Sequence, residues 1–135
     1  MNDKSTVLRG FNNTFFEFVE DVISIFPDNM DLKTTKSAFE MFKKANPTSI
    51  IKAWHYFVYT PYKDVIMNGD ISPFFDKDYS GDLTYMSNAV EILNAIDRIR
   101  GPIKSMEENN KMTATVYIQN LCKLSNIYNT LVTEG

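Results

Sequence analysis

The sequence predicts an all-α protein that forms a single compact domain of about six or seven helices over residues 1–135. Apolar residues recur three and four positions apart in several segments, as they do on one face of an α-helix. No run of four or more residues alternates cleanly between apolar and polar, as a half-buried strand would. No linker is long enough to separate two domains, so one core is expected.

The first predicted helix covers residues 7–26 and has the widest apolar surface. Its main stripe consists of Leu8, Phe11, Phe15, Phe18, Val22 and Ile25, and a second set consists of Phe16, Val19, Ile23 and Phe26. Because the two sets together occupy nearly two faces, other helices must cover this one on most sides. Pro27 is expected to end it.

The second helix is predicted to begin after Asp31, a favourable N-cap, and to stop at Asn46-Pro47. Its inner face holds Leu32, Thr35, Ala38, Phe39, Phe42 and Ala45. Thr48 is the expected N-cap of a third helix. The buried side of that helix holds Ile50, Ile51, Trp54, Phe57 and Val58. A further helix is predicted to restart at Thr60-Pro61, where proline is tolerated in the first turn, and to close at Asn68-Gly69.

The second half of the chain begins with a turn at Ser72-Pro73 and a loop over residues 76–81. A helical stripe follows, made of Leu83, Met86, Val90, Leu93, Ile96 and Ile99. Gly101-Pro102 is expected to interrupt that helix. The last predicted helix covers residues 112–132, with Val116, Leu121, Leu124, Tyr128 and Leu131 on one face.

Composition argues against several classes of chemistry. Cys122 is the single cysteine and His55 the single histidine, so one chain forms neither an internal disulfide nor a Cys/His zinc site. Cys122 lies on a helix beside apolar residues, where an inert buried thiol is expected. Adjacent acids such as Glu20-Asp21 point different ways on a helix and cannot share a proton. No catalytic motif is present, so we expect neither an enzyme nor a cofactor.

The loop at residues 76–84 follows part of the calcium-loop template. Asp76, Asp78 and Ser80 occupy its first, third and fifth positions, Gly81 the sixth, and Asp82 follows. Alternate oxygen ligands in a tight turn are what calcium requires. Position twelve, which should be glutamate, is Ser87, so a loop whose Ser80 or Asp82 caps the next helix is the favoured alternative.

Two surfaces are candidates for macromolecular contacts. Lysines could meet phosphates of a nucleic acid through Lys33, Lys36, Lys43, Lys44 and Lys52. Acidic residues lie among them and the net charge is only −3, so an ordinary solvated face is the alternative. Ten Phe, seven Tyr and one Trp are many rings for one core, and surface rings anchor protein partners. The candidate contact residues are Trp54, Tyr59, Tyr62, Phe74, Phe75 and Tyr79.

Short segments along most of the chain carry a resemblance. They are FN at 11–12, FFEF at 15–18, IFPDN at 25–29, KKANP at 43–47, PYKDVI at 61–66, KDYS at 77–80 and YIQNL at 117–121. Over residues 11–128 the chain resembles small, mostly uncharacterised proteins of large nucleocytoplasmic DNA viruses that infect algae and protists. The resemblance transfers no catalytic residue and implies a minor capsid or other virion component.

The first functional hypothesis is therefore a non-enzymatic structural protein that contacts other proteins, with virion or capsid proteins as partners. A nucleic-acid-associated accessory protein that uses the lysine face is the alternative. The polar amino end has no apolar signal core, and no stretch has the length of a membrane span. We accordingly expect a location in the virion or the host cytoplasm rather than secretion.

Overall fold

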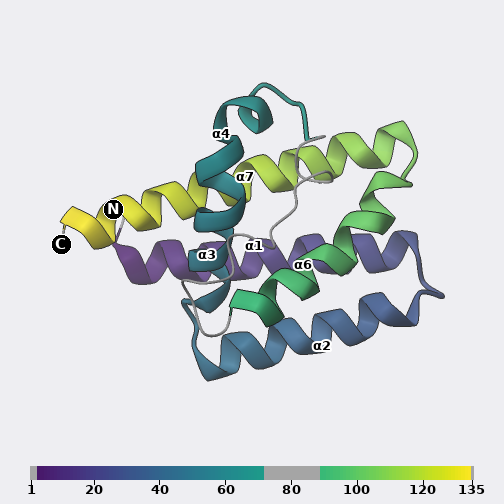
Figure 1. Ribbon diagram of the computed structural model, residues 1–135, viewed down its shortest axis with the longest axis horizontal. Coiled ribbons are helices and arrows are strands. Elements are labelled where there is room, and N and C mark those ends of the chain that lie inside the picture. Colours follow the sequence, from purple (N-terminus) through teal and green to yellow (C-terminus); the bar gives the residue numbers. More distant parts are fainter. Residues whose placement is uncertain (1–2, 72–88, 135) are drawn as a thin grey trace.

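The computed structural model describes residues 3–71 and 89–134, and every regular element in these ranges is helical (Figure 1). The elements are α1 (Lys4–Ile25), α2 (Met30–Ala45), α3 (Ser49–Trp54), the π-helical turn η1 (His55–Tyr59), α4 (Thr60–Met67), α6 (Ala89–Lys104) and α7 (Glu108–Glu134). The predicted all-α class and the single helical arrangement are confirmed for the described part of the chain. The expected turn at Ser72-Pro73, the 76–81 loop and the stripe residues Leu83 and Met86 lie outside it.

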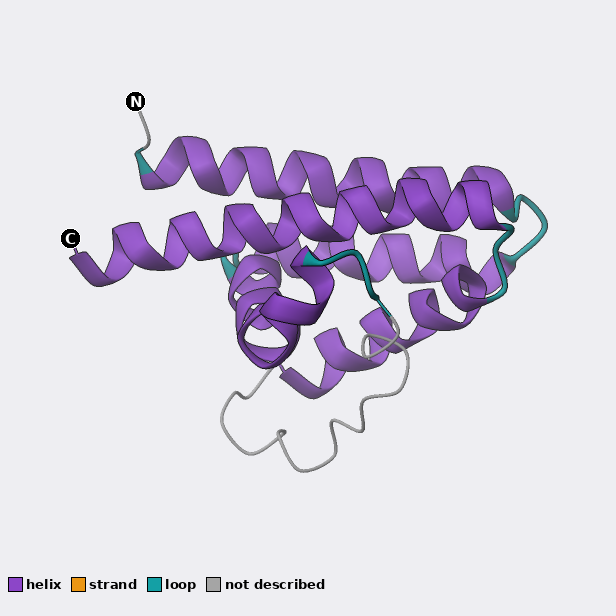
Figure 2. Ribbon diagram, turned by 90° about the horizontal axis from the view of Figure 1, so that it is seen from above, coloured by secondary structure: helices purple, strands orange, loops and turns teal. Residues whose placement is uncertain are grey.

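The long helices run side by side. α1 and α7 pack against each other in opposite directions, and α2 returns along α1 (Figures 1 and 2). The rod formed by α3, η1 and α4 crosses the long helices in Figure 1 and is seen nearly end-on in Figure 2. α6 packs on α2 and also touches α1, α3 and α7. The first helix is therefore covered on several sides, as its wide apolar surface predicted.

The core is built around aromatic rings of α1. Phe15 is fully buried, and its ring lies edge-on to Phe39 of α2 at 4.7 Å and to Trp54 of α3 at 6.1 Å. Phe11 stacks on Phe15 with ring centroids 6.1 Å apart. Offset and edge-on ring pairs add to the free energy gained by burying apolar area. One cluster of rings thus joins α1, α2 and α3.

Two helix starts differ from the prediction. α2 begins one residue before Asp31, because the side chain of Asn29 accepts a hydrogen bond from the backbone N–H of Leu32 at 3.2 Å and acts as the N-cap. Asp31 instead lies in the first turn. Thr48 does precede α3, but its side chain caps nothing, since its hydroxyl donates to Asn46 Oδ1 at 2.8 Å.

Two prolines do not break the helices that contain them. α4 starts at Thr60 with Pro61 in its first turn, as predicted, but no break precedes it, because the backbone runs without interruption from α3 through η1 into α4. Pro61 lacks an N–H and crowds the carbonyl one turn earlier, and the wider π turn just before it relieves this conflict. The predicted interruption at Gly101-Pro102 is wrong, because α6 continues to Lys104. Pro102 lies in the last turn of α6, where it removes only one hydrogen bond.

The remaining boundaries agree more closely with the sequence. α2 ends before Asn46-Pro47 as predicted. α4 ends at Asn68-Gly69, and Gly69 has a φ of 94°, which other residues rarely adopt. α7 is longer than predicted at its amino end, by about one turn. Within the described residues, no helix combines the length and apolar character that crossing a membrane requires.

Candidate protein-binding groove

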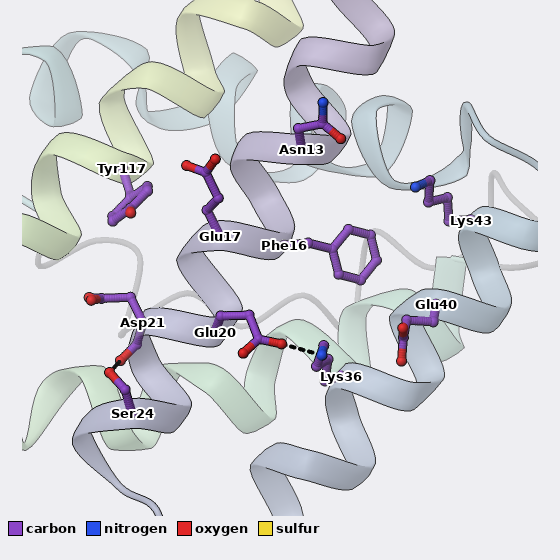
Figure 3. A pocket seen from close by; sticks show the side chains of 10 residues that line it. All are labelled: Asn13, Phe16, Glu17, Glu20, Asp21, Ser24, Lys36, Glu40, Lys43 and Tyr117. Atoms are coloured by element: carbon purple, nitrogen blue, oxygen red, sulfur yellow. Dashed lines mark hydrogen bonds and ion pairs between the residues drawn. The ribbon is translucent and has the colours of Figure 1, made fainter.

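A hollow of about 830 Å³ lies along α1 and α2, and we call it the α1–α2 groove (Figure 3). Its described lining residues are Asn13, Phe16, Glu17, Glu20, Asp21, Ser24, Lys36, Glu40, Lys43 and Tyr117. The volume is within the range of ligand sites in proteins. Its walls come from three helices, so only the tertiary structure assembles it.

Helical spacing explains which residues line the groove. On α1, Asn13, Phe16, Glu20 and Ser24 follow one another at three or four residues, so they share one face. This face lies beside the buried stripe that contains Phe15. The α2 residues of the groove follow the same rule at positions 36, 40 and 43.

The groove carries more carboxylates than cations. Glu20 forms an ion pair with Lys36, and this hydrogen bond raises the pKa of the Lys36 ammonium above its ordinary value. Asp21 lies on the opposite side, toward Tyr117, so the prediction that Glu20 and Asp21 diverge is confirmed (Figure 3). Glu17, which lies near Tyr117 in Figure 3, adds a further carboxylate. The described lining of the groove therefore carries a net negative formal charge.

Two aromatic side chains are partly exposed in the groove. Phe16 packs edge-on against Phe15 at 5.8 Å, and the Lys43 Nζ atom lies 5.5 Å from the centre of its ring. Tyr117 reaches the groove from α7 and packs at 5.5 Å from Phe18. Burial raises the pKa of the Tyr117 hydroxyl, and nearby carboxylates raise it further. The faces of aromatic rings attract cations, as the position of Lys43 over Phe16 illustrates.

The described lining contains no histidine or cysteine. The Ser24 hydroxyl donates to the carbonyl oxygen of Asp21 at 2.6 Å, so it has no adjacent base. No group of three or more possible metal ligands occurs among the described residues. The arrangement is suited to binding positively charged side chains through carboxylates and ring faces.

The predicted aromatic contact residues are not in this groove. Trp54 is 1% exposed and belongs to the core, so the prediction of a surface role is wrong for it. Its helix turns this ring toward α1, where it packs on Phe11 at 6.4 Å. Tyr59 and Tyr62 are partly buried and pack against the core, and their contact role stays a prediction. The other three candidates, Phe74, Phe75 and Tyr79, lie outside the described residues.

The structure does not bring the five candidate lysines together. Lys36 and Lys43 line the α1–α2 groove, where Lys36 is paired with a carboxylate. Lys52 lines a separate hollow of about 270 Å³ against the end of α7. Lys33 and Lys44 are exposed on α2. A continuous phosphate-binding surface therefore does not follow from these lysines.

The single thiol and the single imidazole lie in different environments. Cys122 is fully buried on α7, and burial raises its pKa to about 11, although a hydrogen bond from Trp54 acts in the opposite direction. The prediction that this cysteine is buried is confirmed, and its low reactivity stays a prediction. Burial also lowers the pKa of His55, and the positive charge of Lys63 lowers it further. The His55 ring stacks on Tyr59 at 5.1 Å.

The calcium hypothesis is not addressed by the described residues. Asp76, Asp78, Ser80 and Asp82 all lie outside them, so this site stays a prediction. The α1–α2 groove itself was missed by sequence reasoning. Phe16 and Glu20 could have drawn attention to it, because they place a ring and a carboxylate one turn apart beside the buried stripe.

Comparison of the chain with protein-family models, with curated proteins and with solved structures finds no match.

Proposed function

We propose that this chain is a non-enzymatic interaction protein that binds a lysine- and arginine-rich segment of another protein in the α1–α2 groove. The observation that carries the proposal is the combination of partly exposed rings with an excess of carboxylates in one hollow. The sequence resemblance adds the proposal that the partner is a virion or capsid protein of a large DNA virus. In that setting the chain acts as a minor capsid or other virion component.

Charge complementarity supports a basic partner. Among the described residues, Glu17, Glu40 and Asp21 form no ion pair, and they line the same hollow as the Glu20–Lys36 pair. A cationic side chain placed among them gains attraction to several carboxylates, and this attraction also speeds the encounter of the two proteins. The same carboxylates repel nucleic-acid phosphates, which argues against the alternative of a nucleic-acid-associated protein for this groove.

The rings support a specific rather than a diffuse contact. Lys43 already lies over the ring of Phe16, with its Nζ atom 5.5 Å from the ring centre, so a cation fits at this ring. A guanidinium from a partner would find the face of Tyr117 on the other side of α1, beside Glu17 and Asp21. Arginine commonly combines ring stacking with carboxylate pairing in such positions.

A binding measurement tests the groove. The probe is a fluorescent peptide of alternating arginine and glycine, and its anisotropy is measured at increasing salt. The double variant Glu17→Lys/Asp21→Lys should weaken binding about tenfold or more, because it replaces attraction with repulsion at the ring of Tyr117. The matched control is Asp64→Lys/Glu107→Lys, which changes the net charge equally at exposed positions outside the groove.

The two variants separate groove binding from general electrostatics. An equal loss of peptide affinity in both variants would mean that only the net charge of the protein matters, and it would overturn the groove as the binding site. Failure of the unmodified protein to bind the peptide at low salt would also overturn it. The proposal that the chain is a virion component is tested separately by mass spectrometry of purified virus particles. Absence of the chain from these particles would contradict that proposal.

A further inference from the structure

A second, smaller hollow lies at the other end of the same helix and differs in its chemistry. It has a volume of about 250 Å³ and lies between the first half of α1, Lys43 of α2 and the turn that precedes α3. Its described lining residues are Ser5, Leu8, Arg9, Asn12, Asn13, Lys43 and Pro47. We call it the Arg9 pocket. It shares Asn13 and Lys43 with the α1–α2 groove but none of the acidic residues of that groove.

Two cations face this pocket from different helices. Arg9 is exposed on α1, and Lys43 reaches it from α2. No carboxylate is among the described lining residues. Outside this lining, the Asp3 carboxylate accepts hydrogen bonds from the backbone N–H of Thr6 at 2.9 Å and from the Thr6 hydroxyl at 3.1 Å, which lower its pKa, and the charge of Arg9 lowers it further. The described lining of the pocket therefore carries two positive charges and no negative one.

Asn12 provides an independent indication of a ligand. Its side chain is only 3% exposed although it lines the pocket. Its amide nitrogen donates to the carbonyl oxygen of Pro47 at 3.1 Å, which fixes the orientation of the amide. The amide oxygen Oδ1 is buried and has no hydrogen-bond partner in the part of the chain that the structure describes. Buried amide oxygens normally accept a hydrogen bond, so a ligand with a proton to donate suits this position.

From these observations we infer that the Arg9 pocket binds the hydrogen phosphate ion. Arg9 and Lys43 would pair with its two negative charges, and the Ser5 hydroxyl could donate to a third oxygen. The remaining P–OH group would donate to Asn12 Oδ1. The small volume suits an ion of this size better than an extended molecule.

The role of Asn12 makes the site selective. Sulfate has the same shape and charge as hydrogen phosphate, but at neutral pH it has no proton to donate. Methyl phosphate is also mostly a dianion without a P–OH group above pH 6, because its second pKa is near that value. Both ions therefore leave Asn12 Oδ1 without a partner and bind more weakly. The comparison with methyl phosphate distinguishes free phosphate from phosphate esters.

The experiment is a nuclear magnetic resonance titration of the ¹⁵N-labelled protein at pH 7.5 and constant ionic strength. Sodium phosphate should shift the side-chain amide signals of Asn12 and Asn13 and saturate. Sulfate and methyl phosphate should bind about tenfold more weakly, a typical effect of losing one hydrogen bond to a charged ligand. Equal affinities for phosphate and sulfate, or no saturable shift with phosphate, would overturn the proposal.

Variants locate the site. Arg9→Gln should weaken phosphate binding about tenfold or more, whereas Lys44→Gln, which removes an exposed cation outside the pocket, should leave it within about twofold. Asn12→Ala should bring the phosphate and sulfate affinities together, which a purely structural role would not do. If Asn12→Ala does not fold, Arg9→Gln and the comparison of anions on the unmodified protein still decide the question. Arg9 does not line the α1–α2 groove, so failure here leaves the proposed protein-binding role intact.

Discussion

The thiol of Cys122 should react far more slowly in the folded protein than in the unfolded chain. Its side chain is fully buried on α7, and burial raises its pKa from 9.0 to about 11. At pH 8 about one unfolded thiol in ten is the reactive thiolate, but only about one folded thiol in a thousand. The difference in thiolate population alone predicts labelling about 100-fold slower, and limited access of the reagent slows it further.

The assay follows the reaction with a chromogenic disulfide reagent at pH 8, with and without urea. The matched control is the double variant Cys122→Ala/Thr113→Cys, which moves the thiol to an exposed position of the same helix. The thiol of this variant should react at similar rates, within a few-fold, in the folded and the unfolded protein. Labelling of native Cys122 within tenfold of the unfolded rate would refute the reasoning. It would mean that α7 opens readily or that the thiol is not held among apolar side chains.

The raised pKa also predicts a dependence of stability on pH. The unfolded thiol ionises above pH 9, while the folded thiol keeps its proton up to about pH 11. The folded state binds more protons in this window, so the free energy of unfolding falls as pH rises, by up to about 3 kcal/mol. The difference between the unmodified protein and Cys122→Ala isolates this contribution, and parallel curves for the two proteins would contradict it.

Three further predictions concern the core, a helix start and the histidine. Phe15→Ala should lower the free energy of unfolding in urea by about 3–5 kcal/mol, because the ring is fully buried, whereas Phe16→Ala should cost less than half as much. Asn29→Ala should cost about 1 kcal/mol by removing the N-cap of α2, and an equal loss in Asp31→Ala would show that the cap is misassigned. The ring protons of His55 should titrate below pH 6.5, since burial disfavours the imidazolium. Stability should therefore decline as pH falls below 6.5, and a midpoint at or above that value would contradict the assignment.

Some features of the fold could be predicted because they depend on local periodicity. The spacing of Phe11, Phe15, Phe18 and Val22 indicates one helical face wherever the helix is placed, and all four are buried. Gly69 could be predicted to close α4, because a positive φ is favourable mainly for glycine.

Other features depended on competition between neighbouring residues. Asn29 and Asp31 are both good N-caps, and the sequence offers no means of choosing between them. Pro61 is compatible with both a helix start and a continuous helix, provided that a π turn precedes it. The tertiary packing of α3 and α4 on α7 decided in favour of the continuous rod.

The candidate sites were the least accessible to sequence reasoning. The number of rings predicts a surface role for Trp54, yet its side chain is buried and packs edge-on against Phe11 and Phe15. Lys36 was grouped with other lysines on α2, but its partner Glu20 comes from α1. Such pairings join residues far apart in the chain, and periodicity within one helix contains no information about them.

The sequence by itself determined that this protein is helical, which faces of its helices are buried, and that one cysteine and one histidine restrict its chemistry. These properties follow from the repeat of the α-helix and from composition. Only the tertiary structure decided that α1 and α2 form an acidic, ring-lined groove, and that Arg9, Asn12 and Lys43 surround a separate pocket. The physical reason is that a binding site needs side chains from different helices to converge, and their convergence depends on how the helices pack.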